Sequence, residues 1–161
     1  MVRQAAEKDI PIIEGILLDA IQWMDENELH QWEVENVKWS NLSKNYAISD
    51  FFIAYDGDIP AACMALIDYD PVFWEDIPRG ASLYLHKVAV IRKYAGKGFS
   101  KELIDFAKTQ AKDCGIKALR LDCHKNRYKV RAVYEKQGFL CAEKKTLFGR
   151  YETAFYVCDD L

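Results

Sequence analysis

The stretch LYLHKVAVIRKYAGKGFSK, Leu83–Lys101, carries the most information about the fold. Its first half is β-prone and predicts a strand, and the strand leads through a glycine loop directly into a helix. Gly96 and Gly98 allow the backbone to approach a ligand closely. The helix that follows offers unpaired N–H groups and the positive end of its dipole. The stretch therefore predicts a binding site for phosphate groups.

Positive side chains surround this loop, as a polyanionic ligand requires: Arg92, Lys93, Lys97 and Lys101. The loop matches neither of two common phosphate motifs. The sequence AGKGFSKE lacks the spacing of the P-loop, and the dinucleotide pattern G-x-G-x-x-G is not completed. A nucleotide site is the weakest of the alternatives that we consider.

The rest of the chain alternates between helical and strand patterns. We expect helices over residues 9–25, 34–42, 97–114 and 130–137, and strands over 2–6, 51–55, 59–67, 81–90, 117–123, 139–146 and 151–159. Asp9 before Ile10-Pro11 predicts a helix N-cap. The order β-α-α-β-β-β-α-β-α-β-β indicates an α+β fold with a mixed sheet. With 161 residues and no linker, the chain is expected to form one domain, residues 1–161.

The net charge of −3 hides an asymmetry between the two halves of the sequence. Residues 1–80 carry 5 Lys/Arg and 16 Asp/Glu, whereas residues 81–161 carry 17 Lys/Arg and 9 Asp/Glu. Such a division informs about partners rather than about fold. The positive half contains the predicted phosphate site, and the negative half is a candidate region for a cationic partner.

Composition excludes several other classes of protein. Half of the residues are hydrophobic, which argues against disorder, yet no run reaches the roughly 18 apolar residues of a membrane span. The first residues lack an apolar signal core. Five cysteines without a C-x-x-C pair predict reduced thiols and no zinc site. We expect a cytoplasmic protein that binds no metal, nucleic acid or membrane.

Two phrases of the sequence together resemble the GNAT superfamily of acyl-CoA-dependent N-acetyltransferases. One is Val88-Ala89-Val90 followed by Ala95–Ser100, and the other is VYEKQGF, Val133–Phe139. The resemblance extends over essentially the full chain. It implies a twisted, mostly antiparallel sheet of about seven strands, flanked by about four helices, with central strands that splay at the cofactor site. The implied reaction moves an acetyl group from acetyl-CoA to an amine through a tetrahedral intermediate.

The resemblance also assigns the cofactor site. Val88–Val90 would pair with the pantetheine arm, and Gly96–Lys101 would cradle the pyrophosphate. Ala95 departs from the usual Gln or Arg, whose contact Arg92 or Lys93 could supply. The expected cofactor-binding residues are Val88, Ala89, Val90, Arg92, Ala95, Gly96, Lys97, Gly98, Phe99, Ser100, Lys101, Asn126 and Tyr134.

Acetyl transfer needs an acid and a base, and two residues are the leading candidates. The resemblance makes Tyr134 the acid that protonates the departing thiolate; its alternative role is a packed core tyrosine. His86 occupies a strand position where arylalkylamine N-acetyltransferases have a histidine, and an imidazole can accept a proton directly or through water. A structural histidine is the alternative. Tyr84 and His86 are expected to share a strand face with Val88. A Cys123–His124 nucleophile is disfavoured because adjacent strand residues face opposite ways.

Aromatic residues and carboxylates occur together in the regions that such enzymes use for the acceptor. This combination suits a cation, so we hypothesise a cationic amine acceptor, either a small molecule or a peptide terminus. The expected substrate-binding residues are Trp23, His30, Trp32, Tyr69, Trp74 and Tyr84. The helix tryptophans could instead belong to the core. A non-catalytic acyl-CoA sensor is the alternative function, and the resemblance favours a monomer or a homodimer.

Overall fold

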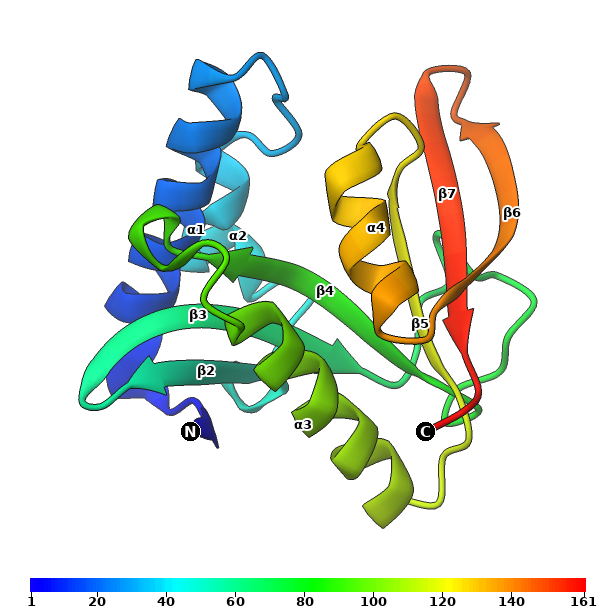
Figure 1. Ribbon diagram of the computed structural model, residues 1–161, viewed down its shortest axis with the longest axis horizontal. Helices are drawn as coiled ribbons and strands as arrows, with labels where there is room; N and C mark the ends of the chain where they lie inside the picture. Colours follow the sequence, from blue (N-terminus) through cyan, green and yellow to red (C-terminus); the bar gives the residue numbers. More distant parts are fainter. The chain divides into compact units, whose positions relative to one another are not determined.

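The computed structural model describes residues 1–161, and its elements follow the predicted order (Figure 1). The strands are β1 (Val2–Gln4), β2 (Phe51–Asp56), β3 (Ile59–Ile67), β4 (Leu83–Val90), β5 (Leu119–His124), β6 (Leu140–Leu147) and β7 (Tyr151–Cys158). The helices are α1 (Ile10–Glu26), α2 (Trp39–Leu42), α3 (Phe99–Asp113) and α4 (Tyr128–Lys136). None of these helices is both long enough and apolar enough to cross a membrane.

Hydrogen bonds order the strands as one seven-stranded sheet, β1-β2-β3-β4-β5-β7-β6. The pairs β1–β2, β2–β3, β5–β7 and β6–β7 are antiparallel, whereas β4 and β5 run parallel. The parallel pairing joins Leu83 to Leu119 and Tyr84 to Arg120. The mixed, mostly antiparallel sheet with four helices confirms the predicted fold class.

The chain divides into two compact units. The first unit comprises Met1–Leu66 and His86–Leu103, and the second comprises Ile67–Leu85 and Ile104–Leu161. Strand β4 and helix α3 therefore contribute residues to both units. Each unit has its own packing.

The core of the first unit forms between α1 and the β2–β3 hairpin. Buried α1 residues recur every three or four positions, which gives the helix one apolar face. They are Ile13, Ile16, Leu17, Ile21 and Met24. Phe51, Ile53 and Cys63 from the hairpin belong to the same cluster. The burial of this face, rather than helix propensity, accounts for most of the stability of such a helix.

Asp9 is the N-cap residue of α1, as predicted, but its side chain makes no capping hydrogen bond to the helix. Its buried carboxylate instead accepts two hydrogen bonds from Arg3, at 2.8 and 2.9 Å, and one from the Ala6 N–H at 2.8 Å. A charged guanidinium in a two-point contact is a stronger partner than a backbone amide. Asp9 therefore joins β1 to the start of α1.

The single helix predicted over residues 34–42 is wrong. A 3-10 turn, Val34–Val37, is separated from α2 by Lys38, whose backbone is extended. Asn41 donates its side-chain amide to the Glu35 carbonyl at 2.7 Å, so a side chain replaces a helical hydrogen bond.

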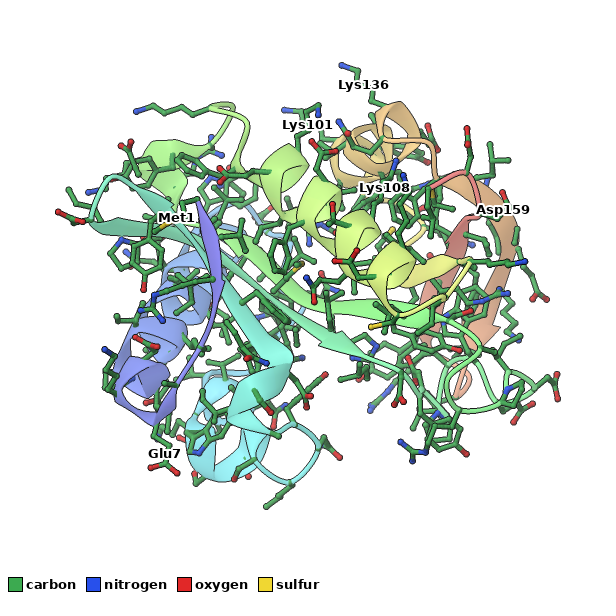
Figure 2. All side chains as sticks on the ribbon, turned by 90° about the horizontal axis from the view of Figure 1, so that it is seen from below. Met1, Glu7, Lys101, Lys108, Lys136 and Asp159 are labelled. Atoms are coloured by element: carbon green, nitrogen blue, oxygen red, sulfur yellow. The ribbon has the colours of Figure 1, made fainter.

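The second unit is built on β5, β7 and β6. Leu119, Leu121 and Cys123 are buried at alternate positions of β5, as the sequence predicts. Lys108 on α3, which Figure 2 labels, donates a hydrogen bond to the carbonyl of Gln137, the residue that follows α4, at 2.7 Å. This contact ties the part of α3 that belongs to the second unit to the helix that carries Tyr134.

Candidate functional site

Within strand β4, Lys87 has a left-handed backbone with φ of 50°. This conformation is costly for a residue with a Cβ, and it breaks the two-residue alternation of a strand. Alternation therefore does not carry past Lys87, and the shared strand face of His86 and Val88 stays a prediction. Strained non-glycine residues of this kind concentrate at functional sites.

The loop after β4 has the geometry of a phosphate cradle. Gly96 and Gly98 both have left-handed backbones, with φ of 76° and 93°. A Cβ at either glycine would meet nothing within 4 Å, so backbone conformation, not crowding, requires glycine here. The backbone N–H of Glu102 donates to the Gly98 carbonyl at 3.0 Å. The preceding N–H groups of the first helical turn have no intrahelical acceptor. These donors fit a pyrophosphate group.

Side chains of the first unit hold this loop in place. The Arg92 N–H donates to Asp19 of α1 at 2.8 Å, and its guanidinium lies 4.5 Å from the centre of the Trp23 ring. Tyr94 is buried and packs edge-on against Phe99 at 5.3 Å. Trp23, which we expected to bind substrate, thus packs against the core and against the Arg92 guanidinium.

His86 shares a hydrogen bond of 2.8 Å between its Nδ1 and the Tyr46 hydroxyl. The two rings meet edge to face at 5.9 Å, and Tyr46 also packs against Phe51 at 5.5 Å. This contact fixes the orientation of the imidazole ring. Tyr46 was missed in the sequence because it lies 40 residues from His86 and belongs to no motif.

The other predicted residues of the first unit lie at the C-terminal end of α1 and beyond it. His30 contacts Asp25 through Nδ1 at 2.5 Å and Glu33 through Nε2 at 3.0 Å. The hydrogen bond with Asp25, aided by Glu33, raises the pKa of His30 above its ordinary value. The Trp32 ring lies 5.0 Å from the Lys87 ammonium. His30 is therefore placed in an exposed acidic environment.

Tyr134 lies on α4, with its ring edge-on to Phe139 at 5.7 Å. Burial raises the pKa of its hydroxyl well above the ordinary value, and Cys123 and Asp122 act in the same direction. The hydroxyl therefore keeps its proton at neutral pH, as a general acid must.

A partly buried network fastens α4 to β7. Arg131 donates from Nε to the Tyr156 hydroxyl at 2.7 Å, and that hydroxyl donates to Glu135 at 2.6 Å. Arg131 also donates to the Lys125 carbonyl at 2.7 Å. The network lies on the helix that carries Tyr134, and long-range pairing of this kind leaves no local signal in a sequence.

Asn126 and its neighbours form the turn between β5 and α4. Asn126 donates its amide to Glu152 at 3.1 Å, and its backbone N–H donates to His124 Nδ1 at 3.2 Å. Burial, with Asp122 nearby, raises the pKa of the Cys123 thiol to about 12. Because a thiol is a poor nucleophile when protonated, the Cys123–His124 alternative loses support.

The loop between β3 and β4 brings two of the predicted acceptor residues together. The Trp74 ring contacts the rings of Tyr84, at 6.3 Å, and Phe155, at 5.1 Å. The Arg120 guanidinium lies 4.9 Å from the Trp74 ring centre. Tyr69 is instead covered by Arg79, 4.4 Å from its ring centre.

A family model and a curated relative match most of this chain. The model of the acetyltransferase (GNAT) family matches residues 17–139. The uncharacterised N-acetyltransferase YesJ of Bacillus subtilis is 26% identical over 148 residues, which cover 84% of this chain and 78% of that protein.

Solved structures share the fold at low sequence identity. A GNAT-family acetyltransferase from Listeria monocytogenes superposes with a TM-score of 0.73 at 23% identity, covering 98% of this chain and 92% of that one. The PaiA N-acetyltransferase of Thermoplasma acidophilum, solved in complex with coenzyme A, gives 0.77 at 16% identity, covering 99% and 98%. With the family match over most of its length, the chain belongs to the GNAT family and is an N-acetyltransferase.

Proposed function

We propose that the protein transfers an acetyl group from acetyl-CoA to a primary amine of a small molecule or a peptide. The observation that carries this proposal is the loop before α3. Two left-handed glycines there precede a helix whose first N–H groups have no intrahelical acceptor. Such donors suit the phosphates of a CoA thioester.

When bound, the thioester supplies an activated acetyl group. The amine nitrogen forms a bond to the carbonyl carbon, and the carbon–sulfur bond breaks. Tyr134 gives its proton to the departing sulfur, and the raised pKa of its hydroxyl means that the proton is present when the thiolate leaves. His86, oriented by Tyr46, takes the proton that the amine loses, directly or through water.

The remaining contacts to the donor follow the sequence prediction. Val88–Val90 would bind the pantetheine arm, and Arg92 and Lys97 would attract the phosphates. Arg92 is held by Asp19 and Trp23 and can compensate for the short side chain of Ala95. Asn126 is a further contact in this proposal.

The proposed acceptor is a cationic amine. The family match includes residues of both compact units, so we also propose that residues 1–161 act as one catalytic domain, as a monomer or homodimer. The five cysteines are unpaired, which suits the reducing cytoplasm.

A panel of acceptors tests the proposal. The protein is incubated with acetyl-CoA and cationic, neutral or anionic acceptors, and thiol release is compared with the N-acetyl product found by mass spectrometry. We expect equal amounts of both products, with the highest kcat/KM for cationic amines. If CoA raises the melting temperature while no acceptor is acetylated, the protein is a sensor and the proposal is wrong.

A further inference from the structure

Two buried polar atoms of the second unit have no hydrogen-bond partner: the Tyr84 hydroxyl and the Trp74 indole N–H. Tyr84 is fully buried, with 0% of its surface exposed. The Ser82 hydroxyl lies near this hydroxyl and accepts a hydrogen bond from Arg120 Nε at 2.9 Å. A buried polar atom without a partner is unfavourable and calls for an explanation, and a missing ligand is one.

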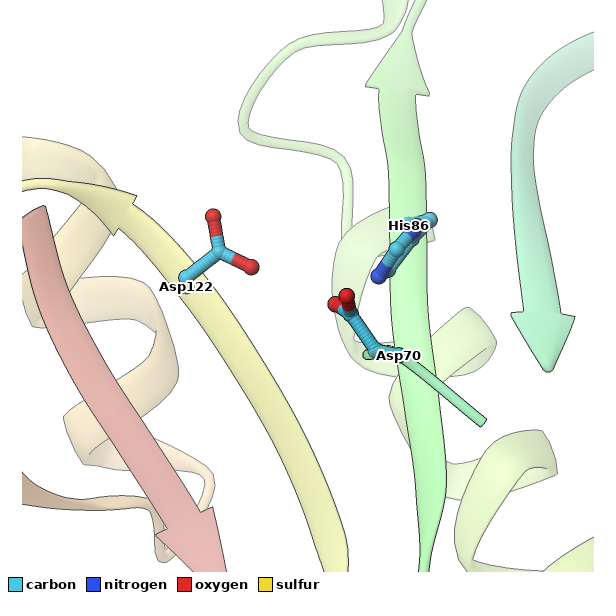
Figure 3. Close-up of side chains that lie close together, drawn as sticks. All are labelled: Asp70, His86 and Asp122. Atoms are coloured by element: carbon cyan, nitrogen blue, oxygen red, sulfur yellow. The ribbon is translucent and has the colours of Figure 1, made fainter. Parts of the chain in front are cut away.

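Two carboxylates lie on the same side of the sheet as Tyr84. Tyr84 pairs with Arg120 of β5, so Asp122, two residues further along β5, shares that face. Asp70 belongs to the loop that packs on this face, and an oxygen of its carboxylate lies within 4.8 Å of one of Asp122 (Figure 3). Asp70 and Arg120 both influence the pKa of the Tyr84 hydroxyl, which burial raises. Tyr84 and Asp70 are therefore near enough to interact electrostatically.

Asp70 is held in position as a binding group would be. It is 4% exposed, and its carboxylate accepts the Phe73 N–H at 3.1 Å. The carboxylates of Asp70 and Asp122 add negative charge to this group of side chains, which favours a bound cation. An ammonium group has three N–H donors and no acceptor, so two carboxylates and one hydroxyl oxygen match it.

We propose that Asp70, Asp122 and Tyr84 bind the ammonium group of the acceptor. This inference rests on the proposed amine acetylation and identifies the residues that select a cationic acceptor. It also assigns a role to Asp122, which carries no motif. Tyr84 then acts in acceptor binding, with its oxygen as the third hydrogen-bond acceptor.

Binding is measured without turnover, using the Trp74 indole N–H resonance as the reporter. The resonance is assigned with Trp74→Phe, and the protein is titrated with propylamine, 1-propanol and propionate. We expect propylamine alone to shift it. Asp122→Asn should weaken this binding about tenfold or more, because a charged hydrogen bond is lost. Asp159→Asn, which removes an exposed carboxylate of the same unit, should leave it unchanged.

Kinetics separate this inference from the proposed function. Asp122→Asn should raise the KM of the amine about tenfold and leave CoA binding, measured by calorimetry, unchanged. Asp70→Asn and Tyr84→Phe, shown to be folded by circular dichroism, should act in the same direction.

If the variants acetylate amines with wild-type KM, the inference is overturned and the proposed function stands. If propylamine binds as expected but no amine is acetylated, the proposed function fails and the cation site stands. A shift of the same resonance by Mg²⁺ or Zn²⁺ at lower concentrations than propylamine, lost in Asp122→Asn, would overturn the inference in favour of a metal site.

Discussion

Tyr134 is the proposed general acid, and burial of its phenol keeps the hydroxyl protonated. Tyr134→Phe keeps the ring that packs on Phe139 and removes only the hydroxyl. We expect kcat to fall by about tenfold or more, in the range typical of a lost general acid, with CoA binding nearly unchanged. Steady-state kinetics and calorimetry measure both. Tyr151→Phe, at an exposed tyrosine of the same unit, is the control. Unchanged turnover in Tyr134→Phe would remove this residue from the mechanism.

His86 is the second side chain whose role a single substitution can test. Glutamine can preserve a hydrogen bond to Tyr46 but does not titrate, so His86→Gln should lower kcat and flatten the rising limb of the rate–pH curve. The curve is recorded at saturating acetyl-CoA. His124→Gln, which changes a histidine of the other unit, should retain the limb. A His86→Gln curve of wild-type shape would point to a different base.

Among the elements, β1 and α1 are joined by an ion pair that makes stability depend on pH. The hydrogen bonds from Arg3 lower the pKa of Asp9 from 3.8 to about 2. A lowered pKa means that the stabilisation is complete above the unfolded-state value and disappears as the pH falls toward the folded-state value. Asp9→Asn should therefore lower the free energy of unfolding by about 1–2 kcal/mol at pH 7, and by much less near pH 2.

Urea unfolding at several pH values between about 2 and 7 measures this difference. Asp58→Asn, in the exposed turn between β2 and β3, serves as the matched control and should show no such trend. A loss of stability in Asp9→Asn that stays constant down to the lowest pH would contradict the ion-pair explanation.

At the scale of the whole molecule, the charge asymmetry of the sequence is redistributed by folding. The first unit carries 9 Lys/Arg and 13 Asp/Glu, and the second carries 13 and 12. The acidic loop over residues 68–76 belongs to the second unit, and the basic segment His86–Leu103 joins the acidic α1 in the first. Each compact unit therefore contains both acidic and basic segments. The contrast between an acidic and a basic half of the sequence does not carry over to the two units.

Most helices and strands could be predicted, because their hydrophobic periodicity depends on residues that are close together in the sequence. The glycine loop before α3 was predicted for the same reason. The helix over residues 34–42 was wrong, since the Asn41–Glu35 hydrogen bond competes with helical pairing. The contact of Tyr46 with His86, and the approach of Asp70 to Asp122, depend on strand register and loop packing. No local pattern contains that information.

The segment His86–Leu103 gives a prediction about ionic strength. It contains Lys87, Arg92, Lys93, Lys97 and Lys101 against one acidic residue, Glu102. Exposed charges attract a polyanion less strongly when salt screens them. The KM for acetyl-CoA should therefore rise several-fold between about 50 and 300 mM NaCl. Lys97→Gln should raise the KM at low salt and reduce its salt dependence.

Lys112→Gln is the matched control, because it removes an exposed lysine from the last turn of α3, in the other unit. It should leave both the KM at low salt and the salt dependence at wild-type values. If Lys112→Gln and Lys97→Gln changed the salt dependence equally, the attraction would come from the net charge of the protein and not from this segment. The position of the positive charge beside the two left-handed glycines would then have no influence on donor binding.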